Sequence, residues 1–267
     1  MTTVSPDTGV GALLRGWRER RRLSQLDLAL LADSSARHIS FIETGRSRPS
    51  EEMVLRLAEQ LDIPVRERNA LLVVAGYAPR YAQTPLDDPA MASVRDGLER
   101  LLAGYEPYPA LVVDGTYTVV AANRGIALLM EGVSEELLAP PLNAMRITLH
   151  PAGLAPRILN LAEWRADLLA QMERQIALVR SPDLRTLYEE VAAYPVADQG
   201  SGGSRARERT PSFALPLVIE HKGQVLSFIA SIATFNTPMD VTVAELAIET
   251  FLPADHATAA YLRERLT

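Results

Sequence analysis

The sequence contains no cysteine among its 267 residues. Disulfides, zinc sites with thiolate ligands and cysteine nucleophiles are therefore excluded, and so is a flavin photosensor that forms a cysteine adduct. The four histidines lie far apart in the chain and show no spacing typical of metal ligands. We therefore predict no metal site and no cofactor.

Long apolar runs are also missing. No stretch approaches the roughly 18 to 20 apolar residues that span a bilayer, and the first residues lack the apolar segment of a signal peptide. We expect a cytoplasmic protein without membrane contact. The chain also has no G-x-S-x-G elbow, H-E-x-x-H zinc helix or Walker P-loop, so its motifs do not indicate an enzyme.

Length and charge indicate two different domains. A chain of 267 residues with 48% apolar content suits two domains with separate cores. The net charge of -6 is unevenly distributed: residues 1–80 hold 12 arginines against 10 acidic residues, and residues 81–267 hold 15 basic against 23 acidic residues. The net charge is therefore +2 for residues 1–80 and -8 for residues 81–267. The basic residues lie in the segment expected to bind DNA, and the acidic second half disfavours non-specific DNA binding.

The segment from Leu23 to Ser50 is the most informative part of the chain. Ser24 is placed to cap one short amphipathic helix, and Ser35 is placed to cap a second. Gly45 follows the second helix, where glycine readily adopts the left-handed conformation of a C-cap. Two short helices joined by a turn of about 3 to 4 residues predict a DNA-binding helix-turn-helix.

The second helix of this pair is the predicted recognition helix, and its N-terminal turn is the part that meets base edges. We predict that Arg37 reads a guanine, because its guanidinium can bond guanine O6 and N7 together. Residues predicted to hold phosphates are Gln25, Ser35, Arg46 and Arg48. The other outward positions of the helix are Ala36, Ser40 and Phe41.

This pattern, with the run from Glu43 to Ser50, resembles the XRE family, which has the lambda-repressor-like fold of five helices. The resemblance covers roughly Gly9 to Tyr81 and implies an ion pair between Arg18 and Glu43. The turn carries Asp33 where the family commonly has glycine, and aspartate tolerates left-handed backbone angles better than most residues. The alternative is an ordinary helical bundle whose charges are solvated.

The rest of the chain predicts the domain plan. Helices are expected near Glu51 to Leu61 and after Pro64, and the predicted domains are residues 1–81, a linker at 82–90, and residues 91–267. The second domain should be α+β, with helices over one face of an antiparallel sheet and a loop at residues 197–209. Its expected helices are 91–103, 126–130 and 161–179. Its expected strands are 110–113, 117–121, 213–220, 225–235 and 241–251.

This order of elements resembles a PAS-like sensor fold. More narrowly, the runs Pro109 to Asp114, Ala121 to Asn123, Leu149 to Pro151 and Glu163 to Arg165 resemble the MmyB-like ligand-binding domain. Regulators of that family carry such a domain behind an XRE-type DNA reader. The resemblance implies that the second domain binds a fatty-acid-like molecule.

An apolar ligand needs an apolar cavity between the sheet and the helices. We predict that Arg165 and His150 hold a carboxylate head group in such a cavity, although a surface arginine and a structural histidine are the simpler interpretations. For the apolar wall the simpler interpretation is plain core. The predicted wall residues are Trp164, Leu168, Met172, Phe213, Leu215, Phe228 and Ile232.

The sequence therefore predicts a non-enzymatic transcription regulator that binds an operator in double-stranded DNA as a homodimer. Two recognition helices would reach successive major grooves roughly 34 Å apart, and a ligand would favour one arrangement of the dimer. One alternative is a second domain that only dimerises or docks a partner, without a small ligand. A further alternative is an unsuspected enzyme.

Overall fold

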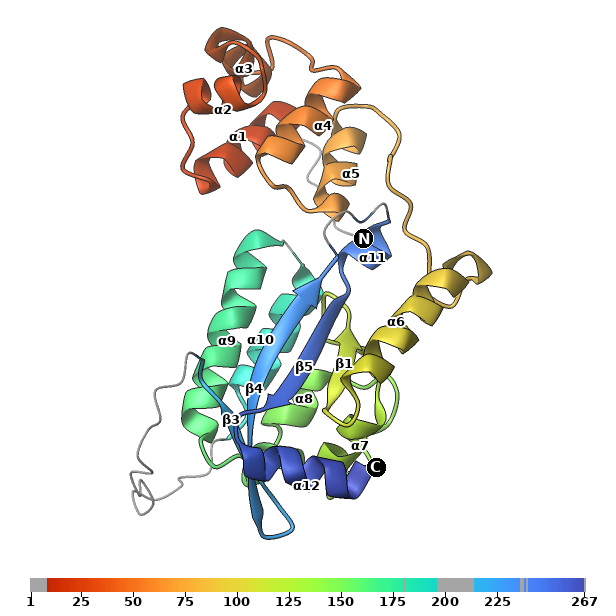
Figure 1. Ribbon diagram of the computed structural model, residues 1–267. Helices are drawn as coiled ribbons and strands as arrows, with labels where there is room; N and C mark the ends of the chain where they lie inside the picture. Colours follow the sequence, from red (N-terminus) through yellow and green to blue (C-terminus); the bar gives the residue numbers. More distant parts are fainter. Residues whose placement is uncertain (1–8, 180, 196–213, 236–237, 239, 267) are drawn as a thin grey trace. The chain divides into compact units, whose positions relative to one another are not determined.

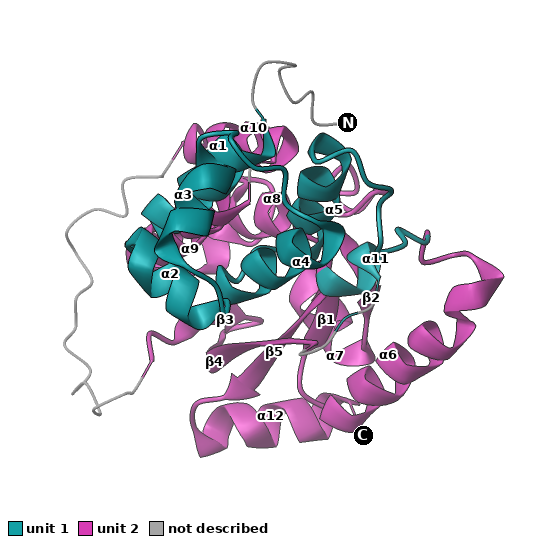
Figure 2. Ribbon diagram, turned by 90° about the horizontal axis from the view of Figure 1, so that it is seen from above, with its two compact units in different colours: residues 1–84, 237–244 teal, residues 85–236, 245–267 magenta. Residues whose placement is uncertain are grey.

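The computed structural model describes residues 9–179, 181–195, 214–235, 238 and 240–266. The chain divides into two compact units (Figure 2). Unit 1 comprises residues 1–84 and 237–244, and unit 2 comprises residues 85–236 and 245–267. The prediction places residues 237–244 in the C-terminal domain, but their contacts place them in unit 1.

The N-terminal part of unit 1 is helical, as predicted. Its helices are α1 (Val10–Arg20), α2 (Gln25–Leu31), α3 (Ala36–Glu43), α4 (Glu51–Gln60) and α5 (Val65–Val74) (Figure 1). Helix α1 packs closely on α3, because a Cβ atom added at Gly11 would lie 2.1 Å from the carbonyl oxygen of Ile42. The core beneath them is formed by the buried side chains of Leu14, Leu28, Ile39, Ile42 and Leu57.

The ends of α2 and α3 follow the predicted signals. Ser24 caps α2 in a reciprocal capping box with Asp27, and the side chain of Ser35 accepts a hydrogen bond from the backbone N–H of His38. Asp33 in the intervening turn has φ of 47°, and Gly45 after α3 has φ of 73°. Both residues adopt the left-handed conformation that the turn chemistry required.

Unit 2 is the predicted α+β domain. Its strands are β1 (Ala110–Val113), β2 (Val119–Ala122), β3 (Leu217–His221), β4 (Gln224–Thr234) and β5 (Ala247–Pro253). They form one antiparallel sheet in the order β2-β1-β5-β4-β3. Its helical elements are η1 (Pro89–Met91), α6 (Ala92–Tyr105), α7 (Arg124–Met130), α8 (Ala144–Leu149), η2 (Ala155–Arg157), α9 (Leu161–Leu178), α10 (Pro182–Ala192) and α12 (His256–Leu266).

Helices cover both faces of this sheet, whereas the sequence predicted cover on one face. Helices α9 and α10 lie on one side and α6 lies on the other (Figure 1). The alternation along β1 explains the two cores: Leu111 and Val113 join the larger cluster, while Ala110 and Val112 pack with Leu98 of α6. The sheet is therefore buried from both sides at its centre.

The predicted strand at 241–251 is correct only in its second half. Residues Val241–Ala244 form the short helix α11, because the side chain of Asp240 accepts a hydrogen bond from the backbone N–H of Thr242 at 2.8 Å and starts a helical turn. Helices α8, α10 and α12 were not predicted from the sequence. The predicted loop at 197–209 lies outside the described residues.

Candidate functional sites

One arginine-rich surface and one cavity are the candidate sites. The first is the exposed side of α3. Arg37 is exposed near its start, and Ser40 and Phe41 are half-buried one turn further on. The guanidinium carbon of Arg37 lies 5.2 Å from the Phe41 ring centroid, and that of Arg46 lies 5.9 Å from it. Phe41 thus packs beneath two exposed cations and orients them along one side of the helix.

Helix α3 is held in place by a buried ion pair. Arg18 donates from Nε and Nη2 to the two carboxylate oxygens of Glu43, at 2.6 and 2.9 Å. The Glu43 side chain is only 2% exposed, and the hydrogen bonds to it raise the pKa of the Arg18 guanidinium further above its usual value. This bidentate pair confirms the implied contact between α1 and the end of α3.

Gln25 belongs to the same network. Its side-chain amide donates to the second carboxylate oxygen of Glu43 at 2.8 Å. Gln25 therefore links the first turn of α2 to the end of α3. Ser35 and Ala36 lie at the N-terminus of α3 itself, where Ser35 is exposed and Ala36 half-buried.

Arg48 has a structural contact that the sequence did not reveal. Its guanidinium donates to the carbonyl oxygen of Ala75 from Nε at 3.1 Å and from Nη2 at 2.7 Å, and it lies 5.4 Å from the Tyr77 ring centroid. Arg48 therefore caps the C-terminus of α5. Arg46 is exposed beyond Gly45.

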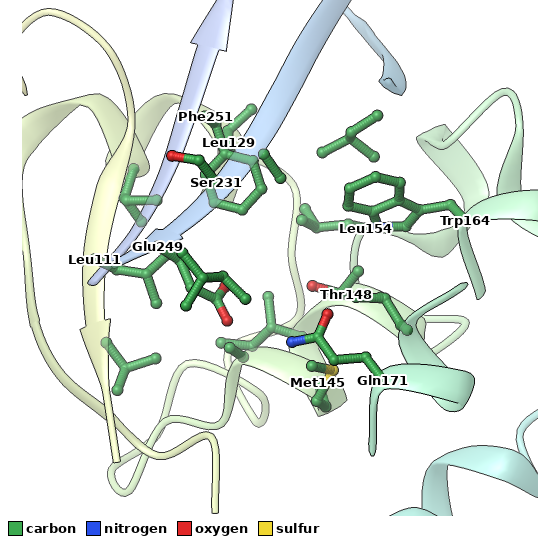
Figure 3. Close-up of a pocket in the computed structure, with 18 of the residues that line it drawn as sticks. Leu111, Leu129, Met145, Thr148, Leu154, Trp164, Gln171, Ser231, Glu249 and Phe251 are labelled. Atoms are coloured by element: carbon green, nitrogen blue, oxygen red, sulfur yellow. The ribbon is translucent and has the colours of Figure 1, made fainter. Parts of the chain in front are cut away.

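The second candidate site is a cavity of about 490 Å³ in unit 2. It lies between one face of the sheet and helices α7, α8 and α9, and most of its lining is apolar (Figure 3). Trp164 and Leu168 of α9 line it, as predicted, and so do Leu215 and Ile232. A cavity of this size and polarity suits a small, mainly apolar molecule.

Other residues predicted for the cavity lie elsewhere. Met172 and Phe228 are fully buried core residues that do not line the cavity. Phe213 lies outside the described residues. Arg165 donates from Nη2 to the carbonyl oxygen of Ala192 at 2.6 Å, so its guanidinium is turned toward the end of α10.

His150 is also outside the cavity lining. Its Nδ1 accepts a hydrogen bond from the backbone N–H of Ala152 at 3.0 Å, and its ring meets that of Tyr194 edge-on, with ring centroids 4.9 Å apart. These contacts are local packing after α8. His150 and Arg165 therefore do not form the carboxylate-binding pair that the sequence predicted, because both bond away from the cavity.

One carboxylate in the cavity wall was not predicted from the sequence. Glu249 lies on β5, the central strand of the sheet, and its side chain extends into the cavity, which Gln171 enters from α9 (Figure 3). Burial raises the pKa of Glu249 to about 7. A glutamate between apolar residues of a central strand breaks the expected pattern, and that signal was available in the run 247–251.

Tyr117 lies close to this carboxylate. Burial raises the pKa of Tyr117 to about 12, and the negative charge of Glu249 adds to the effect. The Gln171 amide donates weakly to the Tyr117 hydroxyl at 3.4 Å. Ser231 also borders the cavity, but its hydroxyl is 2.7 Å from that of Thr250 on the opposite face of the sheet.

Comparisons with known proteins agree with this architecture. Residues 94–264 match the model of the MmyB-like transcription regulator ligand binding domain. The chain belongs to this family. Residues 14–68 match a helix-turn-helix family. This MmyB-like protein is therefore a DNA-binding transcription regulator with a ligand-binding domain, and both matched families are regulatory rather than enzymatic.

No curated protein matches the chain significantly. Among solved structures, the regulator is similar to one described as the structure of an RNA-binding light-oxygen-voltage receptor, with 14% sequence identity and a TM-score of 0.26. The match covers 99% of this chain and 63% of that chain. Over the described residues, no helix is both long and apolar enough to cross a membrane, and no three potential metal ligands gather together.

Proposed function

We propose that this regulator is a cytoplasmic, homodimeric operator-binding protein whose cavity senses a small, mainly apolar ligand, with fatty-acid-like molecules as the class implied by resemblance. The observation that carries the proposal is the 490 Å³ apolar cavity in a chain that also holds a helix-turn-helix. Helix α3 would enter the major groove of the operator. Two copies would bind half-sites about one helical turn apart.

Within α3, Arg37 is the proposed base-reading residue, because it is exposed in the first turn and supported by Phe41. Ser40 and Ala36 would contact the groove beside it. Ser35 and Arg46 would hold phosphates at the two ends of the helix. Gln25 and Arg48 each have a protein partner, so they would contact phosphates only through their remaining N–H groups.

The connection between β4 and β5 is the proposed route by which the cavity controls DNA binding. These strands carry cavity residues such as Ile232 and Glu249, yet residues 237–244 between them belong to unit 1. Asp240 accepts hydrogen bonds from the backbone N–H and the hydroxyl of Thr84 at 3.1 and 2.7 Å. A shift of either strand upon ligand binding would therefore pull on a segment anchored in the DNA-binding unit.

The segment around Asp240 is also anchored through the neighbouring residue Val241. The backbone N–H of Val241 donates to the carbonyl oxygen of Ala82 at 2.8 Å, and the Val241 side chain is 1% exposed. Helix α11, which Val241 begins, contacts α5 of the same unit. A ligand that favours one position of β4 and β5 would thus bias unit 1 by its difference in affinity for the two states.

The test uses the full chain and an operator chosen by in vitro selection. Operator affinity is measured by fluorescence anisotropy with and without decanol, an uncharged occupant of suitable size. We expect at least an approximately fivefold change in Kd. Leu168→Trp, which fills the cavity, should abolish the change, and Asp240→Ala should reduce it while operator binding without decanol persists.

Two results would contradict the proposal. If decanol occupied the cavity and left operator affinity unchanged, the second domain would serve dimerisation or partner docking instead. If Leu168→Trp responded to decanol like the parent protein, the response would not pass through this cavity.

A further inference from the structure

The position of Glu249 in the sheet fixes where its carboxylate lies. On β5 it pairs with Leu111 of β1 on one side and with Ile232 of β4 on the other. Paired residues in an antiparallel sheet point to the same face. All three line the cavity, so the Glu249 carboxylate stands in the floor of the cavity between two apolar side chains (Figure 3).

This carboxylate has no partner within the described part of the chain. None of the described residues donates a hydrogen bond to it, although burial is deep enough to raise its pKa to about 7. Tyr117 is near, but its hydroxyl makes no hydrogen bond to Glu249. That hydroxyl accepts a hydrogen bond from the Gln171 amide at 3.4 Å. Glu249 is half-buried and faces an apolar cavity. An acceptor that is largely removed from water and has no donor is costly, so it is a favourable site for a donor supplied by a ligand.

The remaining polar lining has the same character. Thr148 of α8 and Gln171 of α9 are neutral, and Asp167 of α9 is a second carboxylate, exposed where the lining reaches solvent. Among the described residues that line the cavity, none is arginine, lysine or histidine. Arg174, the cation whose charge acts on Tyr117, is exposed and is not part of the lining.

These surroundings disfavour an anionic head group. A fatty-acid carboxylate next to an ionised Glu249 would place two negative charges in an apolar space without a described cation to balance them. An ammonium group would instead form a charge-assisted hydrogen bond, which is stronger in a space of low dielectric constant than in water.

We propose that the cavity selects an amphiphilic amine, in which a mainly apolar body fills the cavity and a protonated amine bonds to Glu249. This inference rests on the proposed function for the existence of a mainly apolar ligand. It keeps the apolar body of a fatty-acid-like molecule and replaces the carboxylate head group, which the resemblance implies, by an amine. Gln171 and Thr148 would orient the same head group through their side-chain oxygens. Asp167 would attract the cation at the rim.

The test compares three compounds with the same chain and different heads. Decylamine, decanol and decanoate, each below its aggregation limit at neutral pH, compete with the uncharged fluorescent probe N-phenyl-1-naphthylamine for the full-length protein. We expect decylamine to displace the probe at a concentration at least about tenfold below that of decanoate. Decanol should lie between them.

Variants of the cavity assign the preference to a residue. Glu249→Gln should bring the amine and the carboxylate to within about threefold of each other, while decanol and the probe bind as before. Glu249→Asp keeps the charge and should keep the order of the three compounds. Asp167→Asn, the matched loss of a rim carboxylate, should weaken decylamine less than Glu249→Gln does.

The inference is wrong if decanoate matches or exceeds decylamine in the parent protein. It is also wrong if Glu249→Gln leaves their ratio unchanged, or if the preference disappears in Asp167→Asn alone. These results need no DNA, so they stay separate from the proposed function, which fails when cavity occupants leave operator affinity unchanged. A protein that bound neither the probe nor any of the three compounds would contradict both.

Discussion

Each unit of this regulator holds a glutamate among apolar side chains, buried in unit 1 and half-buried in unit 2, and the surroundings of the two carboxylates differ. In unit 1, Glu43 accepts two hydrogen bonds from Arg18 and one from Gln25. In unit 2, Glu249 receives no hydrogen bond from the described residues and opens onto the cavity. A buried charge that is fully matched holds two helices together, whereas an unmatched one leaves binding capacity for another molecule.

The two units also differ in how closely their elements pack. Helices α1 and α3 approach so closely at Gly11 that a single Cβ atom would meet backbone. In unit 2 the sheet and helices α7, α8 and α9 stand apart around a cavity of about 490 Å³. Close packing and matched charge suit a rigid DNA-reading surface, while a hollow core with an unmatched polar group suits recognition of a ligand.

The largest effect on stability should come from removing the cation that pairs with Glu43 in unit 1. Arg18→Ala leaves Glu43 buried without its cation and should cost about 3 to 5 kcal/mol of unfolding free energy. Urea unfolding of unit 1 can be followed by the fluorescence of Trp17 in a Trp164→Phe background, because the two tryptophans lie in different units.

Arg15→Ala on the same helix is the matched control. Arg15 pairs with Glu19 at 2.7 Å, but the two side chains are 60% and 52% exposed. Its loss should cost much less unfolding free energy than the loss of Arg18, because water screens an exposed pair. Similar losses for the two variants would mean that the Arg18–Glu43 pair does not hold α3 in place.

The difference between the units also decides what the sequence could predict. The ends of α2 and α3 are encoded by nearby residues: Ser24 bonds three residues ahead, and Gly45 relieves its own backbone. Such signals are readable in a short window. The pair of Arg18 and Glu43 joins distant positions, and only the family resemblance implied it.

The features that decide the connection between β4 and β5, and those that form the cavity, are non-local. Asp240 starts α11 within unit 1 rather than extending a strand, and its anchor at Thr84 is 156 residues away in the sequence. The cavity arises from the spacing of several elements, so periodicity could not separate Leu168, which lines it, from Met172, which is core. The role of Glu249 depends on strand register, which the sequence alone did not fix.

The second prediction is a gain in unfolding free energy, whereas the first is a loss. Burial raises the pKa of Glu249 to about 7, so the folded state holds this proton more tightly than the unfolded state does. The associated stability is complete below about pH 4.5 and is lost as the pH rises through about 7. Replacing the carboxylate by an amide removes that loss.

Glu249→Gln should therefore stabilise unit 2 at about pH 8 relative to the parent protein, by up to about 3 kcal/mol, with little gain at pH 4. Unfolding of a Trp17→Phe background, followed through Trp164, measures this difference. Tyr117, Asp167 and the exposed Arg174 surround the site in both proteins, so their contributions largely cancel in the comparison.

Glu99→Gln removes one exposed carboxylate of α6 and controls for net charge. A gain at high pH in both variants would indicate relief of general repulsion in the acidic unit. A loss in Glu249→Gln would show that a group outside the described residues satisfies the carboxylate.

The third prediction tests whether DNA reading belongs to unit 1 alone. The binding free energies of the selected operator and of a variant in which one guanine is replaced are compared. Arg37→Ala should reduce the difference between them by about 1 to 3 kcal/mol. Glu249→Gln should leave this discrimination unchanged without a ligand. Anisotropy titrations with both DNA duplexes measure it, and an unchanged ratio in Arg37→Ala would remove Arg37 from the reading surface.

The smallest effect is expected at Arg46, on the exposed side of α3 beyond Gly45. As a phosphate contact it contributes affinity without sequence information, so Arg46→Ala should weaken all DNA sequences alike. The slope of log K against log salt should become shallower by about 1 for each subunit bound, because one phosphate contact is lost. Arg56→Ala is the matched control, since Arg56 pairs with Glu52 on α4. A sequence-dependent loss in Arg46→Ala would instead assign Arg46 to base reading, and the Phe41 ring that lies near both Arg37 and Arg46 would then support two reading residues.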